Sequence, residues 1–361
     1  MPTKLKPRPA EDVRTSAPKV EAAPHRNHAE WLALHSEEIL EPDLPIIDSH
    51  HHLWMRAGAR YLLDEYLADA QTGHNICASV FVDCGAFYRK TGPAAMAPVG
   101  QAEFANGIAA MAASGAYGKT LVCAAIVGAA DITVGAEVAE VLDAQIAISR
   151  ERFRGIRLIT KWDPDEELNN GRLIVPRDLM QDRDFRAGFA MLGPRKLSFD
   201  AMVYHPQLLE LAELARAFPD TTIVVDHVGG LVSETRTYRE RREQAIAHWR
   251  SSLAELAKYP NVYIKLGGLG MPYLGYGFEK LAVPASSERL AQAWGPVFRS
   301  CIDAFGPERC MFESNFPPDK EMVSFAVLWN TFKRVAAGYS ADEKRALFYG
   351  AAAKAYRLNL D

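Results

Sequence analysis

The chain has 361 residues, of which 48% are hydrophobic and 24% are charged, so disorder is excluded as its main state. Its 41 basic and 45 acidic side chains give a net charge of -4, which provides no basic surface for nucleic acid and no polybasic membrane arm. No apolar run reaches the roughly 18 residues that a membrane-spanning helix requires, and the N-terminal residues lack the apolar segment of a secretory signal. The five cysteines form no CxxC pair, which favours a reducing compartment, and we expect a cytoplasmic protein.

Residues 1–44 are expected to form an N-terminal arm followed by a short helix. Residues 1 to about 24 are rich in Pro, Lys, Glu and Ala and show no periodicity, which is typical of a mobile arm. The apolar spacing over His28–Leu40 predicts a short amphipathic helix, which Pro42 and Pro45 would end. The remaining residues, 45–361, are predicted to form one domain.

Short apolar runs alternate with longer helical segments along this domain. The runs are almost continuously apolar, as strands buried on both faces are. Eight such strands joined by helical crossovers predict an α/β fold, a (β/α)8 TIM barrel. An open doubly wound sheet is the alternative, but no GxGxxG follows the first run. The runs are Pro45–Ser49, Ile76–Asp83, Thr120–Val127, Phe153–Thr160, Leu197–Tyr204, Thr222–Asp226, Val262–Leu266 and Cys310–Ser314.

Helices are predicted over Gln207–Phe218, Ala245–Lys258 and Glu288–Phe305, and Ala341–Leu358 is expected to close the domain. Two segments, Phe87–Ala116 and Lys161–Arg195, are expected to be long βα-loop insertions. Both follow the carboxyl end of a predicted strand, which is the barrel face that carries active sites. We therefore expect them to form a lid or a pocket wall.

The first predicted strand ends in three consecutive histidines. His50 and His52 are two residues apart, so on an extended strand they point to the same side and can bind one metal ion together. His51 points the other way and is interpreted as a packing residue or as support for the neighbouring ligands. A purely structural histidine cluster is the alternative, but three histidines in a row at a strand end are rare.

Four motifs in order resemble one family. They are Asp48-x-His50-x-His52 followed by Trp54, then Arg154-Gly155-Ile156-Arg157, then Asp226-His227-x-Gly229, and finally Ser314-Asn315-Phe316-Pro317. Together they resemble the amidohydrolase superfamily, and within it the amidohydrolase-related group that contains lactonases and decarboxylases. The resemblance implies a TIM-barrel hydrolase with its site at the carboxyl ends of the strands.

The resemblance also implies a set of metal-binding and catalytic residues. It places a metal on His50 and His52, with His205 or His227 as a further ligand, and it makes His227 a residue that binds metal or orients substrate. The family normally has Asp where this chain has Asn315, and an amide cannot act as a general base. We therefore predict that Glu313, on the same strand face, replaces that Asp as metal ligand or base, and that Asn315 contacts substrate or water. An ion pair of Glu313 with a barrel cation is the structural alternative.

Five further residues are predicted to bind substrate. Arg157 can hold a carboxylate as a bidentate partner, and Lys265, inside an apolar strand, must be paired or must face the pocket. Asp83 ends the second strand, and Trp54 and Tyr204 can form an apolar wall. A barrel-end ion pair for Arg157 and ordinary core packing for the aromatic residues are the alternatives.

The predicted function is that of a lactonase, which opens a cyclic ester that can carry a carboxylate. The predicted cofactor is one divalent ion, Zn or alternatively Mn, although a metal-free mechanism stays open because of Asn315. Non-oxidative decarboxylation of an aromatic or enoic acid is the second hypothesis, and a non-catalytic ligand-binding barrel is the third. The expected partner is a small-molecule substrate, and the sequence permits a homo-oligomer without specifying one.

Overall fold

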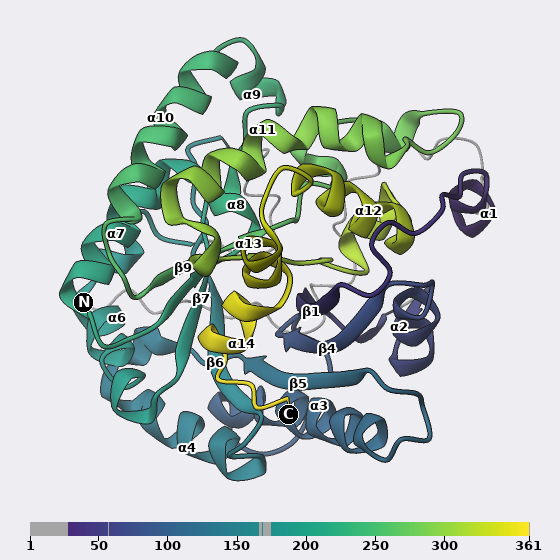
Figure 1. The fold of residues 1–361 in the computed structure, drawn as a ribbon. Coiled ribbons are helices and arrows are strands. Elements are labelled where there is room, and N and C mark those ends of the chain that lie inside the picture. The colour runs from purple at the N-terminus through teal and green to yellow at the C-terminus, as the bar shows by residue number, and fades with distance from the viewer. Residues whose placement is uncertain (1–27, 57, 166–167, 169–174, 361) are drawn as a thin grey trace.

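A computed structural model describes residues 28–56, 58–165, 168 and 175–360 of the protein. Eight parallel strands follow one another around a barrel in the order β1-β4-β5-β6-β7-β8-β9-β10, with helices outside (Figure 1). All eight predicted strands are present, so the predicted TIM barrel is confirmed. The strands are β1 Pro45–His51, β4 Asn75–Val82, β5 Leu121–Gly128, β6 Phe153–Ile159, β7 Ser198–Met202, β8 Ile223–Val225, β9 Val262–Leu266 and β10 Cys310–Phe312.

The barrel closes without a regular ladder between its last and first strands. Just beyond β10, the amide of Asn315 donates to the carbonyl of His50 at 2.9 Å, and the amide of His52 donates to the carbonyl of Phe316 at 2.8 Å. Asp48 completes this seam, because it accepts from the amide of Ser314 at 2.8 Å and from its hydroxyl at 2.6 Å. Burial raises the pKa of Asp48 to about 6, although the bonds from Ser314 oppose the rise.

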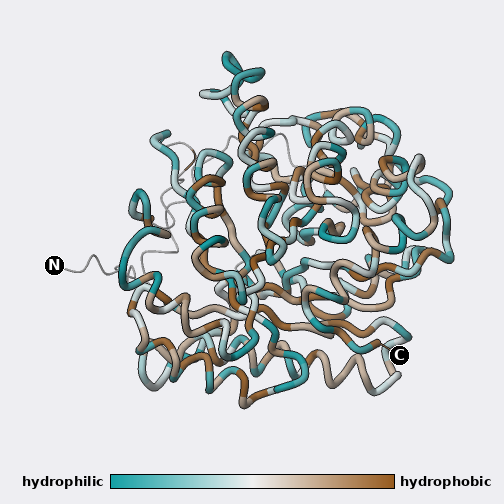
Figure 2. Tube along the Cα trace, turned by 60° about the vertical axis from the view of Figure 1, so that its left-hand side comes forward, coloured by the Kyte–Doolittle hydropathy of each residue, from teal (hydrophilic) through white to brown (hydrophobic). Residues whose placement is uncertain are grey.

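The helices pack their apolar faces against the outside of the barrel. Figure 2 shows hydrophobic segments beside hydrophilic ones along these helices, as expected for elements that are buried on one side. A short hairpin of β2 Trp54–Arg56 and β3 Ala59–Tyr61 follows β1. The described helices are α1 His28–Ala33, α2 Leu63–Ala70, α3 Val99–Ala113, α4 Ala139–Ile148, α6 Arg183–Phe189, α7 Leu208–Ala217, α8 His227–Gly230, α9 Arg236–Arg239, α10 Arg242–Leu256, α11 Ser287–Phe305, α12 Phe325–Val335, α13 Ala341–Arg345 and α14 Ala351–Ala355.

The N-terminal helix is shorter than its apolar spacing predicts. It ends at Ala33, because the following segment is held by tertiary bonds. Glu37 accepts from the amide of Ser287 at 2.6 Å, and the ammonium of Lys333 donates to the carbonyl of Leu40 at 2.7 Å. These contacts with α11 and α12 replace the hydrogen bonds that a longer helix would make. Residues 1–27, which include the predicted arm, lie outside the described residues.

The two predicted insertions contain helices of the barrel. Phe87–Ala116 includes α3, which packs on β5, and Lys161–Arg195 includes α6. Part of the second segment, including Asn169–Gly171, lies outside the described residues. No helix in the described part of the chain is long and apolar enough to cross a membrane.

The C-terminal segment packs against the barrel beside β1 and β10. Helix α13 continues through a π-helical turn, Ala346–Gly350, into α14. Tyr356 follows α14, is fully buried, and donates from its hydroxyl to Asp200 Oδ2 at 2.6 Å inside the barrel. It therefore joins the C-terminal segment to the polar centre of the barrel.

Candidate active site

The polar side chains predicted from the motifs converge at the carboxyl ends of the barrel strands. His50 comes from β1, Arg157 from β6 and Lys265 from β9, while Glu313 directly follows β10 and His227 lies two residues after β8. All five side chains are buried. Polar groups survive in such an interior only when they pair with one another or with a ligand.

Glu313 and His227 form the tightest pair of the site. Glu313 Oε1 accepts from Nδ1 of His227 at 2.7 Å and from the His227 amide at 3.2 Å. The backbone after β8 makes this double contact possible, because His227 has φ 52° and Val228 has φ 51°. Burial opposes ionisation of Glu313, but the charge of His227 outweighs it, and the pKa of Glu313 is lowered to about 2. Burial likewise opposes protonation of His227, and the charge of Glu313 reverses this and raises the pKa of His227.

His50 is surrounded by charged groups and by His52. The ammonium of Lys265 donates to His50 Nδ1 at 3.1 Å, and His50 Nε2 lies 3.2 Å from Nε2 of His52. His52 Nδ1 donates to the carbonyl of Val82 at 2.8 Å, so the ring nitrogens can form one chain of donors and acceptors. Burial and the charge of Lys265 lower the pKa of His50, although the charges of Asp226 and Glu313 oppose this change.

Lys265 is the cation at the centre of the barrel. Its Nζ donates to Asp200 Oδ2 at 2.7 Å and to Asp226 Oδ1 at 2.9 Å. Burial opposes its charge, but Asp200 and Asp226 raise the pKa of Lys265 above its ordinary value. Burial opposes the charge of Asp226, but Lys265 holds the pKa of Asp226 well below its ordinary value. The lysine is therefore fully engaged by the protein.

Three buried polar atoms around His50 have no hydrogen-bond partner among the described residues. They are Glu313 Oε2, Asp226 Oδ2 and Arg157 Nε. Buried polar atoms are nearly always bonded, so three in one place indicate room for water, an ion or a polar ligand. Glu313 Oε2 lies 2.9 Å from His50 Nδ1, which brings two acceptor atoms together, and a cation would relieve that repulsion.

The donor set fits a divalent metal ion. His50, His227 and Glu313 each offer one donor atom, and these atoms all lie within 4.8 Å of one another. Two imidazoles and one carboxylate are the ligands of many catalytic zinc sites. The ammonium of Lys265 supplies part of the same positive charge, 3.1 Å from His50 Nδ1. The structure thus offers these three residues as a candidate metal group, with His52 beside it.

The remaining predicted substrate-binding residues lie around this group to different extents. Arg157 Nη1 is 3.5 Å from His50 Nε2, and Arg157 also donates to the carbonyl of Asp83. The Asp83 carboxylate accepts from the hydroxyl of Tyr88 at 2.9 Å. The ring of Trp54 stacks on His52, with centroids 5.9 Å apart.

Tyr204 and His205, the two predicted residues just after β7, make other contacts. His205 packs against Tyr238, with ring centroids 5.4 Å apart, and against His248 at 5.8 Å. Burial and the charge of His248 lower the pKa of His205 to about 4, and its ring is not part of the candidate metal group. The hydroxyl of Tyr204 donates to the carbonyl of Leu168 at 2.7 Å.

Asn315 points to an acid that the motifs did not single out. Its Nδ2 donates to Asp319 Oδ1 at 2.7 Å, and the amide of Gly270 donates to Asp319 Oδ2 at 3.0 Å. Asp200 was missed in the same way. An acid inside an otherwise apolar strand was the available signal for Asp200, whereas Asp319 lies after two prolines with no such pattern.

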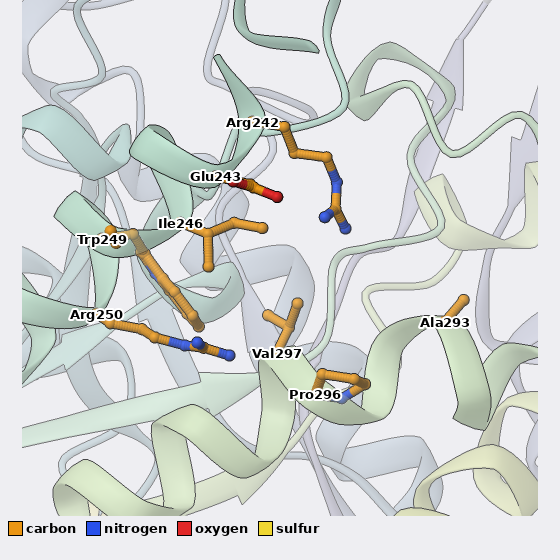
Figure 3. A pocket seen from close by; sticks show the side chains of 9 residues that line it. Arg242, Glu243, Ile246, Trp249, Arg250, Ala293, Pro296 and Val297 are labelled. Atoms are coloured by element: carbon orange, nitrogen blue, oxygen red, sulfur yellow. The ribbon is translucent and has the colours of Figure 1, made fainter. Parts of the chain in front are cut away.

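A separate groove of about 390 Å³ lies on the outside of the barrel. Figure 3 shows side chains of α10, including Ile246 and Arg250, facing Pro296 and Val297 of α11 across it. None of the residues that line this groove belongs to the polar centre of the barrel.

Fold and site together define a (β/α)8-barrel protein with a histidine and carboxylate centre at the carboxyl ends of its strands. The chain belongs to the amidohydrolase family, whose model matches residues 47–358. It is 31% identical over 338 residues to the uncharacterized protein y4mH of Sinorhizobium fredii, which covers 88% of this chain and 99% of that protein.

Two Burkholderia proteins are also similar to the chain. An L-fucono-1,5-lactonase of Burkholderia multivorans is 31% identical over 183 residues, which is 50% of this chain and 58% of that enzyme. The crystal structure of an amidohydrolase from Burkholderia multivorans with bound zinc superposes with a TM-score of 0.64 at 25% identity. That comparison covers 87% of this chain and 99% of the other.

Proposed function

We propose that the protein is a lactonase that uses water to open a small cyclic ester, with one divalent ion, zinc in the first instance, held by His50, His227 and Glu313. The observation that carries the proposal is the unpartnered Oε2 of Glu313 beside two histidines in a buried polar centre. The similarity to a protein named L-fucono-1,5-lactonase supports the choice of a lactone among amidohydrolase substrates.

When bound, the ion would polarise an ester carbonyl and lower the pKa of a water molecule. The side chains around it have separate tasks. Arg157 has an unpartnered Nε and is placed to donate a hydrogen bond to a substrate oxygen, either the carbonyl or a carboxylate. Lys265 is occupied by Asp200 and Asp226, so in this proposal it fixes the ring of His50 and does not reach the substrate.

Glu313 orients His227 through Oε1, and its unpartnered Oε2 is the atom that would bind the metal ion. A carboxylate whose pKa is lowered to about 2 is a good ligand and a weak base. We therefore assign Glu313 a role as ligand and orienting group, which is the ligand alternative of the sequence prediction.

The test measures the metal content of the purified protein and its turnover of a panel of sugar and aromatic lactones. Lactone opening is monitored as acid release in a pH-indicator assay. We expect one zinc per chain, loss of turnover with a chelator, and recovery when zinc is restored. Glu313→Gln should lower kcat/KM by at least about 100-fold, as the loss of a ligand or electrostatic group does. Glu308→Gln is the control, because Glu308 is an exposed acid just before the same strand.

Turnover of Glu313→Gln within about twofold of wild type would sink the proposed role of this residue. Carbon dioxide release from aromatic or enoic acids, without lactone opening, would instead favour decarboxylation. A zinc-free folded protein that still opens lactones would move the carbonyl-polarising task to Arg157 and the histidines.

A further inference from the structure

Just after β10, the last barrel strand, the chain has the amide Asn315 where the resemblance leads one to expect a carboxylate. The structure supplies a carboxylate one helical turn later. The amide of Asp319 donates to the carbonyl of Asn315 at 3.1 Å, and the Asn315 side chain donates back to Asp319 Oδ1 at 2.7 Å. Both side chains are almost completely buried, with 1% of their surface exposed. The two residues therefore form one closed unit at the end of β10.

The same carboxylate fixes the loop that follows β9. Asp319 Oδ2 accepts from the amide of Gly270 at 3.0 Å. This loop is packed closely against the site, because a Cβ on Gly267 would lie 2.4 Å from Cγ of Glu313 and a Cβ on Gly268 would lie 2.4 Å from Nδ1 of His227. A displaced loop would thus press on both members of the Glu313–His227 pair.

We propose that Asp319 is a positioning residue of the active site that acts through Asn315 and through this glycine loop. Asn315 uses Nδ2 on Asp319, so its Oδ1 is the remaining group, an acceptor for a water or substrate hydroxyl. The Asn315–Asp319 pair would then share between two residues the contact and the negative charge that a single aspartate at position 315 would provide. This inference rests on the lactonase proposal for its kinetic readout only.

The charges around Asp319 agree with such a role. Burial raises the pKa of Asp319 to about 7, and the amide of Gly270 and the charge of His227 oppose the rise. Glu313, the other acid that acts on it, raises the pKa further. Lys320, the next residue, pairs with Asp69 at 2.7 Å, so its charge is directed toward that acid.

The kinetic test uses Asp319→Asn. Glu321→Gln is the matched control, because Glu321 is an exposed acid in the same short 3-10 helix, Pro318–Glu321. We expect Asp319→Asn to lower kcat by about 10- to 100-fold, as the loss of a group that orients active-site residues does, with a smaller change in KM. The pH profile of kcat should lose a limb near neutrality. The double variant Asn315→Asp with Asp319→Asn, which moves the carboxylate back onto the strand, should recover part of kcat.

A second readout needs no turnover. In a deuterated, 15N-labelled protein, the side-chain amide of Asn315, assigned by its loss in Asn315→Ser, should exchange slowly, and it should lose this protection in Asp319→Asn. Fast exchange in the wild type, or unchanged kcat and pH profile in a folded Asp319→Asn, would overturn the inference. If Asp319→Asn does not fold, the double variant is tested in its place. A folded double variant without turnover would also overturn the inference. A protected amide in a protein that opens no lactone would reject the lactonase proposal and leave the pairing intact.

Discussion

Replacing Lys265 with methionine removes the cation at the centre of the barrel and leaves two acids without their partner. Lys265 Nζ contacts Asp200 at 2.7 Å and Asp226 at 2.9 Å, and all three side chains are completely buried. Methionine has a similar length, so the change removes charge with little change in volume. The variant therefore reports mainly on the electrostatics of the site.

The expected cost follows from these distances. At an effective dielectric constant of about 20, a unit charge pair separated by just under 3 Å is worth about 6 kcal/mol before desolvation. The desolvation of both partners offsets much of that attraction in the native protein, but removal of one partner leaves the other buried and unpaired. Such removals cost about 3–5 kcal/mol, which we expect as the loss in the free energy of unfolding for Lys265→Met.

The assay is urea unfolding followed by far-UV circular dichroism and tryptophan fluorescence. Lys258→Met is the control, since Lys258 pairs with Glu255 on the surface and its side chain is 65% exposed. We expect that control to change the free energy of unfolding by less than about 0.5 kcal/mol. In a double-mutant cycle, Asp200→Asn should be at least about 1 kcal/mol less destabilising in Lys265→Met than in wild type. Equal effects of the two lysine substitutions, or strict additivity in the cycle, would refute the reasoning.

Two further predictions concern pH and the glycine loop. Burial and a neighbouring ammonium lower the pKa of His74 to about 4 in the folded protein, below its unfolded value of about 6.5. As the pH falls, the unfolded chain thus binds a proton on His74 before the folded protein does. The free energy of unfolding should therefore fall by up to about 3 kcal/mol as the pH drops from 6.5 to 4. In His74→Gln, the urea midpoint should depend less on pH. Gly268→Ala combines φ +71° with a Cβ 2.4 Å from Nδ1 of His227, whereas Gly306 has φ +75° and open space around it. Both alanine variants should lose about 1–3 kcal/mol of stability from backbone strain, but only Gly268→Ala should also lose most lactone turnover, and equal activity of the two would contradict the packing argument.

The strands could be predicted because their signal is local. The run Ile223–Val225 is apolar on both faces and lies between the polar residues Thr222 and Asp226, so neither its neighbours in space nor its partners are needed to recognise it. The end of α1 could not be predicted, because the bonds of Glu37 and Leu40 come from residues about 250 to 290 positions away. Periodicity contains no information on such contacts.

The candidate site was predictable only as far as its motifs extend. His50, His227 and Glu313 lie in or beside recognisable segments, and the structure brings them within one group. The pairing of His50 with Lys265 joins residues 215 positions apart, and only the closure of the barrel reveals it. Asp319 depends on the path of the chain after Pro317 and Pro318, which no spacing rule specifies.

The contact between Tyr356 and Asp200 has a consequence for the order in which the protein matures during synthesis. Most of the barrel has left the ribosome before Tyr356 has been added, and until then Asp200 lacks the hydroxyl that binds it at 2.6 Å. The charge network around Lys265 is therefore completed only after all eight barrel strands have been synthesised. During elongation Asp200 therefore has Lys265 but not the tyrosine hydroxyl as a partner, until the segment after α14 packs against the barrel.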